Sequence, residues 1–313
     1  MSKKNTLKNY LGEQLSESEL CPEDLLKGQE AAFERDIARL HARKSEFVEV
    51  SCPACNKENE NTVFTKFDFT FHRCSSCSTI YMSPRPSETL MSDYYLNSEN
   101  YAYWAKYIFP ASEATRRQKI HKPWLERING YCNDFNINRG TLLEVGPGFG
   151  TFCAVVTESN FFRRVIAVEP TPELAEACRK RGVEVIEKRI EDIGAELDTV
   201  DVVVAFEVIE HLFDPSFFLK AARSKLSKSG LLVLSCPNGL GFDISILGSN
   251  SLAVDAEHVN LFNPTSLSKL LEDLGFEVLL SETPGRLDAE FVRDSALKGE
   301  IHLDPFLQCP FLK

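Results

Sequence analysis

The sequence lacks any apolar run near the roughly 18–20 residues that a helix needs to cross a bilayer. Its first twenty residues, MSKKNTLKNYLGEQLSESEL, lack the apolar core of a secretory signal. The chain is also not basic, because it has 35 Lys and Arg and 46 Asp and Glu, which gives a net charge of −11. An overall basic surface for nucleic acid is therefore absent. We expect a cytoplasmic protein with no membrane contact, and the charge argues against a nucleic-acid partner.

Internal repeats and low-complexity segments are also missing. The 313 residues accommodate one large α/β domain and a smaller part. Composition divides the chain into five expected segments: helical (1–50), rich in Cys and aromatic residues (51–84), aromatic and then basic (85–138), α/β (139–283) and a C-terminal tail (284–313).

The α/β segment alternates short apolar runs with helix patterns. The runs TLLEV, VIAVE, VEVI, VDVVVAF, LLVLSCP and GFEVLLSE predict strands. Three expected helices begin at a capping residue followed by proline and end at glycine: Thr171 to Gly182, Asp214 to Gly230 and Asn263 to Gly275. Strands that alternate with helices indicate βαβ units and a mainly parallel sheet.

Four of the ten cysteines have the spacing of a metal site. Cys52-x-x-Cys55 and Cys74-x-x-Cys77 are separated by 18 residues, and VFTKFDFTF between them suits short strands. Two such pairs supply four thiolates for a tetrahedral ion, which predicts a structural zinc ribbon. Redox chemistry of the paired thiols is the alternative. The other six cysteines are expected to be buried as small apolar side chains.

A glycine-rich loop follows the first strand of the α/β segment. Gly146, Gly148 and Gly150 form G-x-G-x-G, which lets the backbone approach a ligand at the carboxyl edge of a parallel sheet. Glu169 ends the next strand, where a carboxylate can accept hydrogen bonds from ribose hydroxyls. A dinucleotide site is the alternative, although its fingerprint, G-x-G-x-x-G, is spaced differently.

The fourth strand run, VDVVVAF, ends abruptly in Glu207, Glu210 and His211. Their i, i+3, i+4 spacing would put them on one face of a helical turn. His258 follows the fifth strand and returns to the same sheet edge. Three interpretations remain open: the groups orient the loop, His211 acts as a general base, or the carboxylates and imidazoles bind a divalent cation.

The glycine loop with its preceding and following acids resembles motif I of class I S-adenosylmethionine-dependent methyltransferases, over about residues 139–282. The resemblance implies a Rossmann-like, mainly parallel, seven-stranded sheet and S-adenosylmethionine as cofactor. The cofactor-binding residues that it implies are Glu144, Gly146, Gly148, Phe149, Gly150, Glu169, Pro170, Ile190 and Phe206.

The E-x-x-E-H pattern with a later histidine resembles the metal site of small-RNA 2′-O-methyltransferases and is similar to ubiquinone-pathway O-methyltransferases. Carried over, it implies Glu207, Glu210, His211 and His258 as catalytic residues and as ligands of Mg²⁺ or Mn²⁺.

The segment before the α/β part carries a further resemblance. A zinc ribbon that ends in Y-x-x-P-R-P resembles bacterial methyltransferases of surface-polysaccharide and sugar-nucleotide pathways. It implies a small-molecule acceptor, a sugar or nucleotide sugar, methylated on oxygen. A metal-independent sugar C- or N-methyltransferase and a non-catalytic subunit that binds the cofactor are the alternatives. The aromatic residues Tyr94, Tyr95, Tyr101, Tyr103, Trp104 and Tyr107 are either a lid over the site or ordinary helix packing. The oligomeric state stays open.

Overall fold

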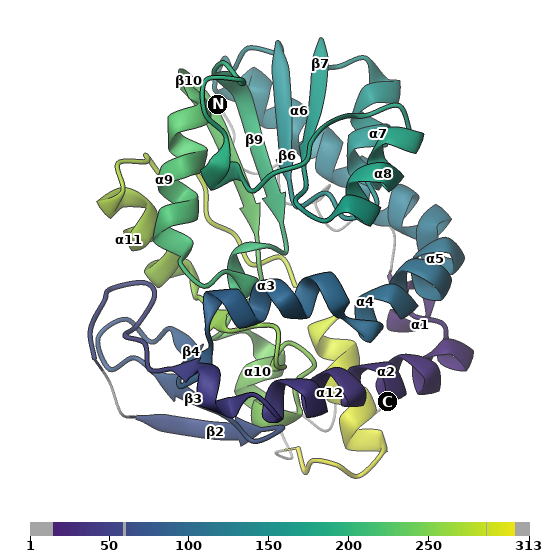
Figure 1. The fold of residues 1–313 in the computed structure, drawn as a ribbon, viewed down its shortest axis with the longest axis vertical. Helices are drawn as coiled ribbons and strands as arrows, with labels where there is room; N and C mark the ends of the chain where they lie inside the picture. Colours follow the sequence, from purple (N-terminus) through teal and green to yellow (C-terminus); the bar gives the residue numbers. More distant parts are fainter. Residues whose placement is uncertain (1–14, 59–60, 286, 304–313) are drawn as a thin grey trace.

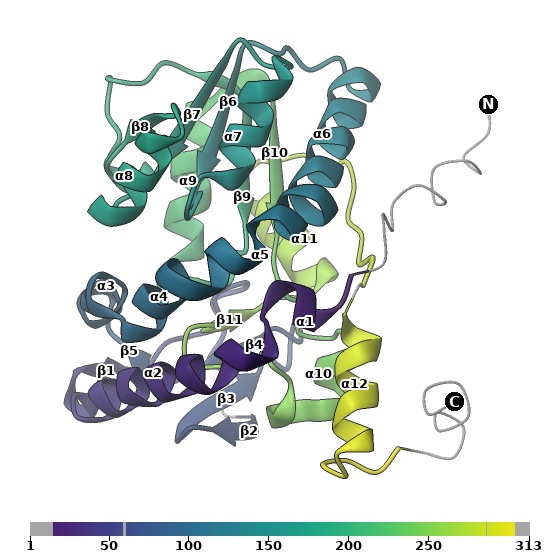
Figure 2. The same ribbon diagram turned by 90° about the vertical axis from the view of Figure 1, so that its right-hand side faces the viewer.

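The computed structural model describes residues 15–58, 61–285 and 287–303. A parallel sheet with its helices forms one half of the molecule, and a small antiparallel sheet with its helices forms the other (Figure 1). Between the two halves run helices from the first part of the chain (Figure 2). None of the described helices is long and apolar enough to cross a membrane.

The parallel sheet has five strands in the order β10-β9-β6-β7-β8. These are β6 (Thr141–Val145), β7 (Arg164–Val168), β8 (Glu184–Ile186), β9 (Val200–Phe206) and β10 (Leu226–Ser235). Every neighbouring pair is parallel. The central strands are buried on both faces, which explains why they read as continuous apolar runs. The expected Rossmann-like α/β class is confirmed.

The expected number of seven strands is wrong for the described residues, which contain five in this sheet. GFEVLLSE, residues 275–282, forms no strand. Leu279 and Leu280 in it are 42% and 50% exposed. An apolar run becomes a strand only where its backbone finds a ladder partner, and this segment has none among the described residues.

Helices cover both faces of the parallel sheet (Figure 1). The core on one face includes residues of α6 (Lys122–Asp134), α7 (Thr151–Ser159) and α8 (Pro172–Lys180). The core on the other face includes α9 (Pro215–Lys225) and α11 (Pro264–Asp273). Asp214 and Asn263 cap their helices as expected, accepting from Phe217 N at 3.0 Å and Ser266 N at 3.0 Å.

The helix expected to end at Gly230 ends earlier. α9 stops at Lys225, and β10 begins at once with Leu226 beside Val200 of β9. A register shift between Leu226 and Leu231 contains Gly230. Gly230 therefore marks an irregularity within a strand. From the sequence alone, a glycine in this role cannot be told from one that ends a helix.

The other half is built on the antiparallel sheet β11-β4-β3-β2. Its strands are β2 (Thr62–Lys66), β3 (Phe69–Arg73), β4 (Ile80–Met82) and β11 (Asn260–Leu261), and a separate ladder joins β1 (Phe47–Val48) to β5 (Arg85–Pro86). β11 belongs to the expected α/β segment, whereas β2, β3 and β4 belong to the expected zinc ribbon. Two segments about 180 residues apart in sequence thus share one sheet, and the division into domains stays a prediction.

The remaining helices are α1 (Glu17–Leu20), α2 (Glu23–His41), α3 (Glu88–Asn97), α4 (Glu99–Tyr103), α5 (Phe109–Arg116), α10 (Phe242–Leu247) and α12 (Asp288–Leu297). Two π-helical turns, Trp104–Ile108 and Arg117–His121, make α4, α5 and α6 one nearly continuous helix. Short 3₁₀ turns lie at Lys44–Glu46, Ile190–Asp192, Ile209–His211 and Gly248–Asn250. α12 packs against α10 through Val292 and Leu247, while the end of the expected tail, residues 304–313, lies outside the described part.

Candidate active site

The glycine loop leaves the carboxyl end of β6 with a left-handed backbone at all three glycines. The φ angles of Gly146, Gly148 and Gly150 are 67°, 55° and 71°. A Cβ on Gly146 would lie 2.8 Å from Val208 Cγ2, and one on Gly150 would lie 2.8 Å from Cys178 Sγ. No described atom lies within 4 Å of a Cβ placed on Gly148. The loop therefore packs tightly at both ends and has open space at its centre, as a ligand cradle requires.

Glu169 lies directly after the last residue of β7, beside this loop. It is 5% exposed, and its Oε1 accepts from Thr171 N at 2.9 Å. Burial raises the pKa of Glu169, although the Thr171 hydrogen bond lowers it. A carboxylate held by one backbone amide at a parallel-strand end suits hydrogen bonding to ribose hydroxyls.

Glu144 lies inside β6 and is directed at helix α7. The Cys153 thiol donates to its Oε2 at 2.8 Å, and both side chains are buried. Burial raises the pKa of Glu144 to about 7. The side chain thus links β6 to α7, the helix that follows the glycine loop, and a cofactor contact stays a prediction.

The other residues expected at the cofactor lie around the loop. The Phe149 ring is 4.5 Å from that of Phe109 on α5, so the helical layer reaches the glycine loop. The Phe206 ring packs on Trp124 at 4.8 Å. Ile190 is 2% exposed, whereas Pro170 is exposed.

Three of the four expected metal or catalytic residues lie together, two from the turn after β9 and one from the His258 loop. Ligand atoms of Glu210, His211 and His258 lie within 4.8 Å of one another. Glu207 is outside this group: it is exposed, has a φ of 52°, and accepts from Ser235 Oγ at 2.6 Å. The helical turn begins only at Ile209. Glu207, Glu210 and His211 therefore do not share the single helical face that their spacing predicted.

Glu210 is fully buried, and neither of its carboxylate oxygens has a hydrogen-bond partner among the described residues. Burial, followed by the charge of Glu207, raises the pKa of Glu210 well above its ordinary value. A buried charge without a partner is costly. The side chain must therefore be protonated or be matched by a cation.

The two imidazoles beside Glu210 are both held through Nδ1. His211 Nδ1 lies 3.1 Å from the Tyr95 hydroxyl, and His258 Nδ1 donates to the Ala253 carbonyl over 2.8 Å. The ring centroids are 4.7 Å apart, and His211 Nε2 is 3.9 Å from Glu210 Oε1. Metal-binding histidines are typically oriented in this way, with the other nitrogen bonded to a backbone carbonyl or a polar group. A cation here would be bound through Nε2 of each ring.

The two histidines differ electrostatically. Burial, followed by the nearby His258, lowers the pKa of His211 well below its usual range. Burial also acts to lower the pKa of His258, but Asp255 and its neighbours outweigh it and raise the value. His211 is therefore neutral at neutral pH.

Two residues at this site, Glu257 and Asn100, were not expected from the sequence. Glu257 is buried beside His258 and accepts from the Tyr94 hydroxyl and from Asn100 Nδ2. The Tyr95 ring packs edge-on against Tyr101 at 5.5 Å. The glutamate in AEHVNLF gave the only sequence signal, an acid next to the candidate histidine. Of the aromatic cluster, Tyr94, Tyr95 and Tyr101 lie near the site, whereas Tyr103 packs on Tyr107 at 4.7 Å.

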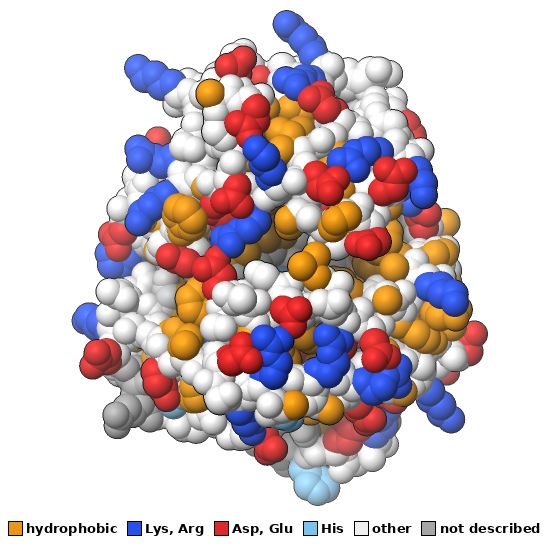
Figure 3. All heavy atoms as spheres, viewed as in Figure 1, with side chains coloured by type: hydrophobic (Ala, Val, Ile, Leu, Met, Phe, Trp, Pro, Cys, Tyr) orange, Lys and Arg blue, Asp and Glu red, His pale blue; other side chains and the backbone are white. Residues whose placement is uncertain are grey.

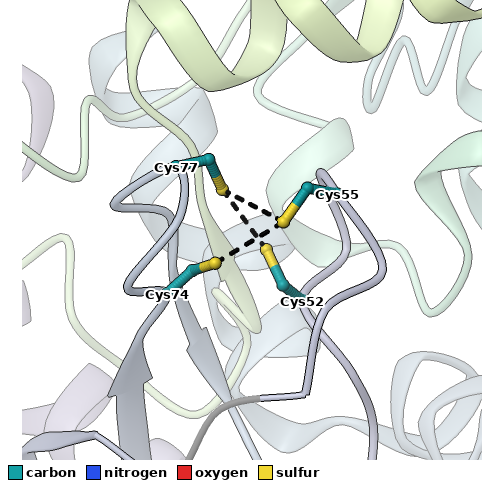
Figure 4. Close-up of side chains that lie close together, drawn as sticks. All are labelled: Cys52, Cys55, Cys74 and Cys77. Carbon is teal, nitrogen blue, oxygen red and sulfur yellow. Dashed lines mark hydrogen bonds between the residues drawn. The ribbon is translucent and has the colours of Figure 1, made fainter.

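The four spaced cysteines converge on one point (Figure 4). Sγ–Sγ distances are 3.5 Å for Cys52–Cys77 and for Cys55–Cys74, and 3.6 Å for Cys77–Cys55. A tetrahedral zinc with Zn–S bonds of about 2.3 Å needs Sγ atoms about 3.8 Å apart. Burial acts to raise the pKa of Cys74, but the amides of Ser76 and Cys77 outweigh it and bring the value to about 7. The four residues fit a structural zinc ion.

The surface is hollowed between the parallel-sheet half and the helical layer, with hydrophobic side chains along the rim (Figure 3). β6 and β9 point their carboxyl ends toward this layer (Figure 1). A parallel sheet with a left-handed glycine loop and an acid–imidazole group at its carboxyl edge is the arrangement of a Rossmann-like α/β domain, a fold whose ligands bind at that edge.

Comparison with known proteins identifies the family. The family model described as "Methyltransferase domain" matches residues 114–281, more than half of the chain. The chain therefore belongs to the methyltransferase-domain family.

Curated relatives match parts of the chain. A probable S-adenosylmethionine-dependent methyltransferase of Mycobacterium tuberculosis is 33% identical over 137 residues, 43% of this chain and 48% of that protein. The ubiquinone biosynthesis O-methyltransferase of Bradyrhizobium diazoefficiens is 28% identical over 233 residues, 62% of this chain and 90% of that protein. The chain spans about half the length of the mycobacterial relatives that it matches. Among solved structures, an S-adenosylmethionine-dependent methyltransferase from Clostridium acetobutylicum is 12% identical with a TM-score of 0.45, over 56% of this chain and 89% of that one.

Proposed function

We propose that the protein transfers the methyl group of S-adenosylmethionine to a hydroxyl oxygen of a small polyhydroxylated acceptor, a sugar or nucleotide sugar. The observation that carries the proposal is the buried, unpartnered Glu210 beside two Nδ1-anchored imidazoles. This group adjoins the glycine loop, because Val208 of the same turn limits the space at Gly146. Family membership and the mycobacterial relatives support S-adenosylmethionine as the methyl donor.

Bound S-adenosylmethionine supplies an electrophilic methyl group on a sulfonium. Gly148 leaves room for the donor, and Glu169 would accept hydrogen bonds from its ribose. With the donor bound, the acceptor oxygen would attack the methyl carbon as the methyl–sulfur bond breaks. The electron pair of that bond would stay on sulfur, which leaves a neutral thioether. In the form without a bound metal ion, the acceptor proton would pass to Nε2 of His211, whose low pKa keeps the ring unprotonated at neutral pH. Alignment and deprotonation are therefore the tasks left to the protein.

We further propose that Glu210, His211 and His258 bind Mg²⁺ or Mn²⁺. A divalent cation would supply the charge that matches Glu210 and would lower the pKa of the acceptor hydroxyl. Glu207 is left as a residue that accepts from Ser235 at the rim. A metal-independent form, with His211 as the only base, is favoured instead if Glu210 carries a proton.

A sugar-like acceptor is supported by the wall beside His211. Two tyrosines here have polar partners, Tyr94 with Glu257 and Tyr95 with His211, and Asn100 adds an amide. Tyr101 adds an aromatic ring that packs on Tyr95. Sugars offer hydroxyls for such groups and apolar ring faces for aromatic stacking. This contact set also supports the aromatic segment as a lid.

The four cysteines would hold a structural zinc ion, since four protein thiolates leave no open coordination position. Such thiolates persist in a reducing compartment, which supports a cytoplasmic location.

The test follows a radiolabelled methyl group from S-adenosylmethionine into fractions of a bacterial extract. The wild type and a Glu210→Gln variant are compared with and without added Mn²⁺. We expect label in polyhydroxylated small molecules, increased by Mn²⁺ in the wild type only. Equal label in the variant would remove the metal proposal, and label in RNA or protein would overturn the acceptor class. Cofactor binding without any transfer would indicate a non-catalytic subunit.

A further inference from the structure

A buried arginine from the expected ribbon contacts the turn that carries the candidate catalytic residues. Arg85, the arginine of the Y-x-x-P-R-P motif, lies in β5 and is 3% exposed. Its Nη2 donates to the Phe213 carbonyl at 2.7 Å, and its guanidinium lies 4.9 Å from the centre of the Phe213 ring. Its Nη1 donates to Asn260 Oδ1 at 2.8 Å. Arg85 thus holds the end of the turn and a residue of β11 together.

Asn260 contacts the same turn from the other side. It lies two residues after His258, and its Nδ2 donates to the Leu212 carbonyl at 2.7 Å and to the Ile209 carbonyl at 3.3 Å. These two carbonyls flank Glu210 and His211. Arg85 and Asn260 together therefore bond three backbone carbonyls of the segment 209–213, which has only one short 3₁₀ turn of its own.

The guanidinium of Arg85 is placed at an energetic cost. Carbonyl and amide oxygens accept from it, and its buried Nε has no partner among the residues that the structure describes. An apolar side chain of similar volume would often stabilise such a site as well or better. The five-donor planar fork of arginine, however, can bridge two acceptors in fixed directions. We therefore interpret the main role of Arg85 as orienting the turn, and not as stabilising the fold.

The expected zinc ribbon also contacts the segment that contains His258 and Asn260. Tyr81 of β4 pairs with Asn260 of β11, and the Met82 amide donates to the Val259 carbonyl at 3.0 Å. Asn263, at the start of α11, donates through Nδ2 to the Cys77 carbonyl at 2.9 Å. The segment 258–263 is thus held by β4 and by the second knuckle. Both parts of the acid–imidazole group, the 209–213 turn and the His258 loop, contact the ribbon.

We propose that the ribbon is the scaffold of the acceptor site, with Arg85 and Asn260 as positioning residues that fix the orientation of His211. This rests on the proposed function for the role of His211 in methyl transfer. It assigns the ribbon an internal role, in place of a surface for nucleic acid or a partner protein.

The test records ¹H–¹⁵N spectra of the histidine rings in zinc-loaded protein labelled with ¹⁵N-histidine. The sequence has only six histidines, and a His211→Gln variant assigns the His211 signals. We expect Arg85→Met and Asn260→Leu each to shift or broaden the His211 signals and to weaken Mn²⁺ binding at least tenfold. The zinc content and the affinity for S-adenosylmethionine should stay unchanged. Arg85→Lys, which can bridge fewer acceptors, should fall between the wild type and Arg85→Met.

An exposed arginine, Arg163, provides the matched control as Arg163→Met and should change none of these readouts. Unchanged His211 signals in both Arg85→Met and Asn260→Leu would overturn the inference, and so would loss of zinc in both. If Arg85→Met does not fold, Asn260→Leu and Arg85→Lys decide. A wild type that neither transfers methyl groups nor binds Mn²⁺ would refute the proposed function alone, because the ring signals report orientation without either activity.

Discussion

Replacing Glu144 by glutamine should change how the stability of the cofactor-free protein depends on pH. Glu144 is 4% exposed, and the Cys153 thiol donates to it at 2.8 Å. Burial raises the pKa of Glu144 from 4.5 to about 7. The folded state therefore holds a proton that the unfolded chain releases at lower pH. Because the folded pKa is the higher one, stability falls as the pH rises from about 4.5 to 7 and stays lowered above that.

The size of the effect follows from the shift. A difference of one pKa unit corresponds to about 1.4 kcal/mol, so a rise from 4.5 to about 7 costs the wild type roughly 3 kcal/mol once ionisation is complete. Between pH 5 and pH 8 about 2.5 kcal/mol of this is lost, since part of the loss already occurs below pH 5. Glutamine has the same shape and does not ionise, so Glu144→Gln should lack this loss.

Urea unfolding followed by tryptophan fluorescence measures the free energy of unfolding at both pH values; the sequence has two tryptophans. At each pH, the free energy of unfolding of the wild type is subtracted from that of the variant. The decisive quantity is this difference at pH 8 minus the same difference at pH 5. Any constant cost of burying the glutamine amide cancels in it. We expect about 2 to 3 kcal/mol in favour of the variant. The exposed Glu272, changed to glutamine, is the control and should give about zero. A value near zero for Glu144→Gln would refute the buried-acid argument.

Three further outcomes are expected. Gly148→Ala should weaken S-adenosylmethionine binding at least tenfold by calorimetry, because the alanine methyl group enters the open centre of the loop. The control is Gly182→Ala, at a glycine with a similar positive φ and no nearby atoms. It should strain the backbone equally without weakening the binding of S-adenosylmethionine. Glu210→Gln should abolish Mn²⁺ binding while raising the melting temperature of the metal-free protein, and a lower melting temperature would contradict an unpartnered carboxylate. Chelation of zinc, or Cys77→Ser, should lower the melting temperature and the zinc content together; Cys132→Ser should leave one zinc per chain.

Much of the fold and part of the site could be predicted from local patterns. The strand runs at 141–145 and 200–206 are apolar because both faces of a parallel strand are buried, so burial is visible in the sequence itself. The glycine loop was equally visible, since its left-handed backbone calls for glycine. The cysteine spacing was visible because each knuckle closes within a few residues, and the convergence of the four thiols follows from it.

Only the tertiary structure decided which distant groups meet. GFEVLLSE reads as a strand, but a strand needs a ladder partner, and in the part of the chain that the structure describes this segment has none. Glu207 leaves the acid–imidazole group because its backbone turns before the helical turn begins. Tyr95 meets His211 across 116 positions of sequence, and Arg85 meets Asn260 across 175. Sequence periodicity records which face of an element is buried, whereas the identity of the partner depends on how the chain packs, and that information is spread over the whole molecule.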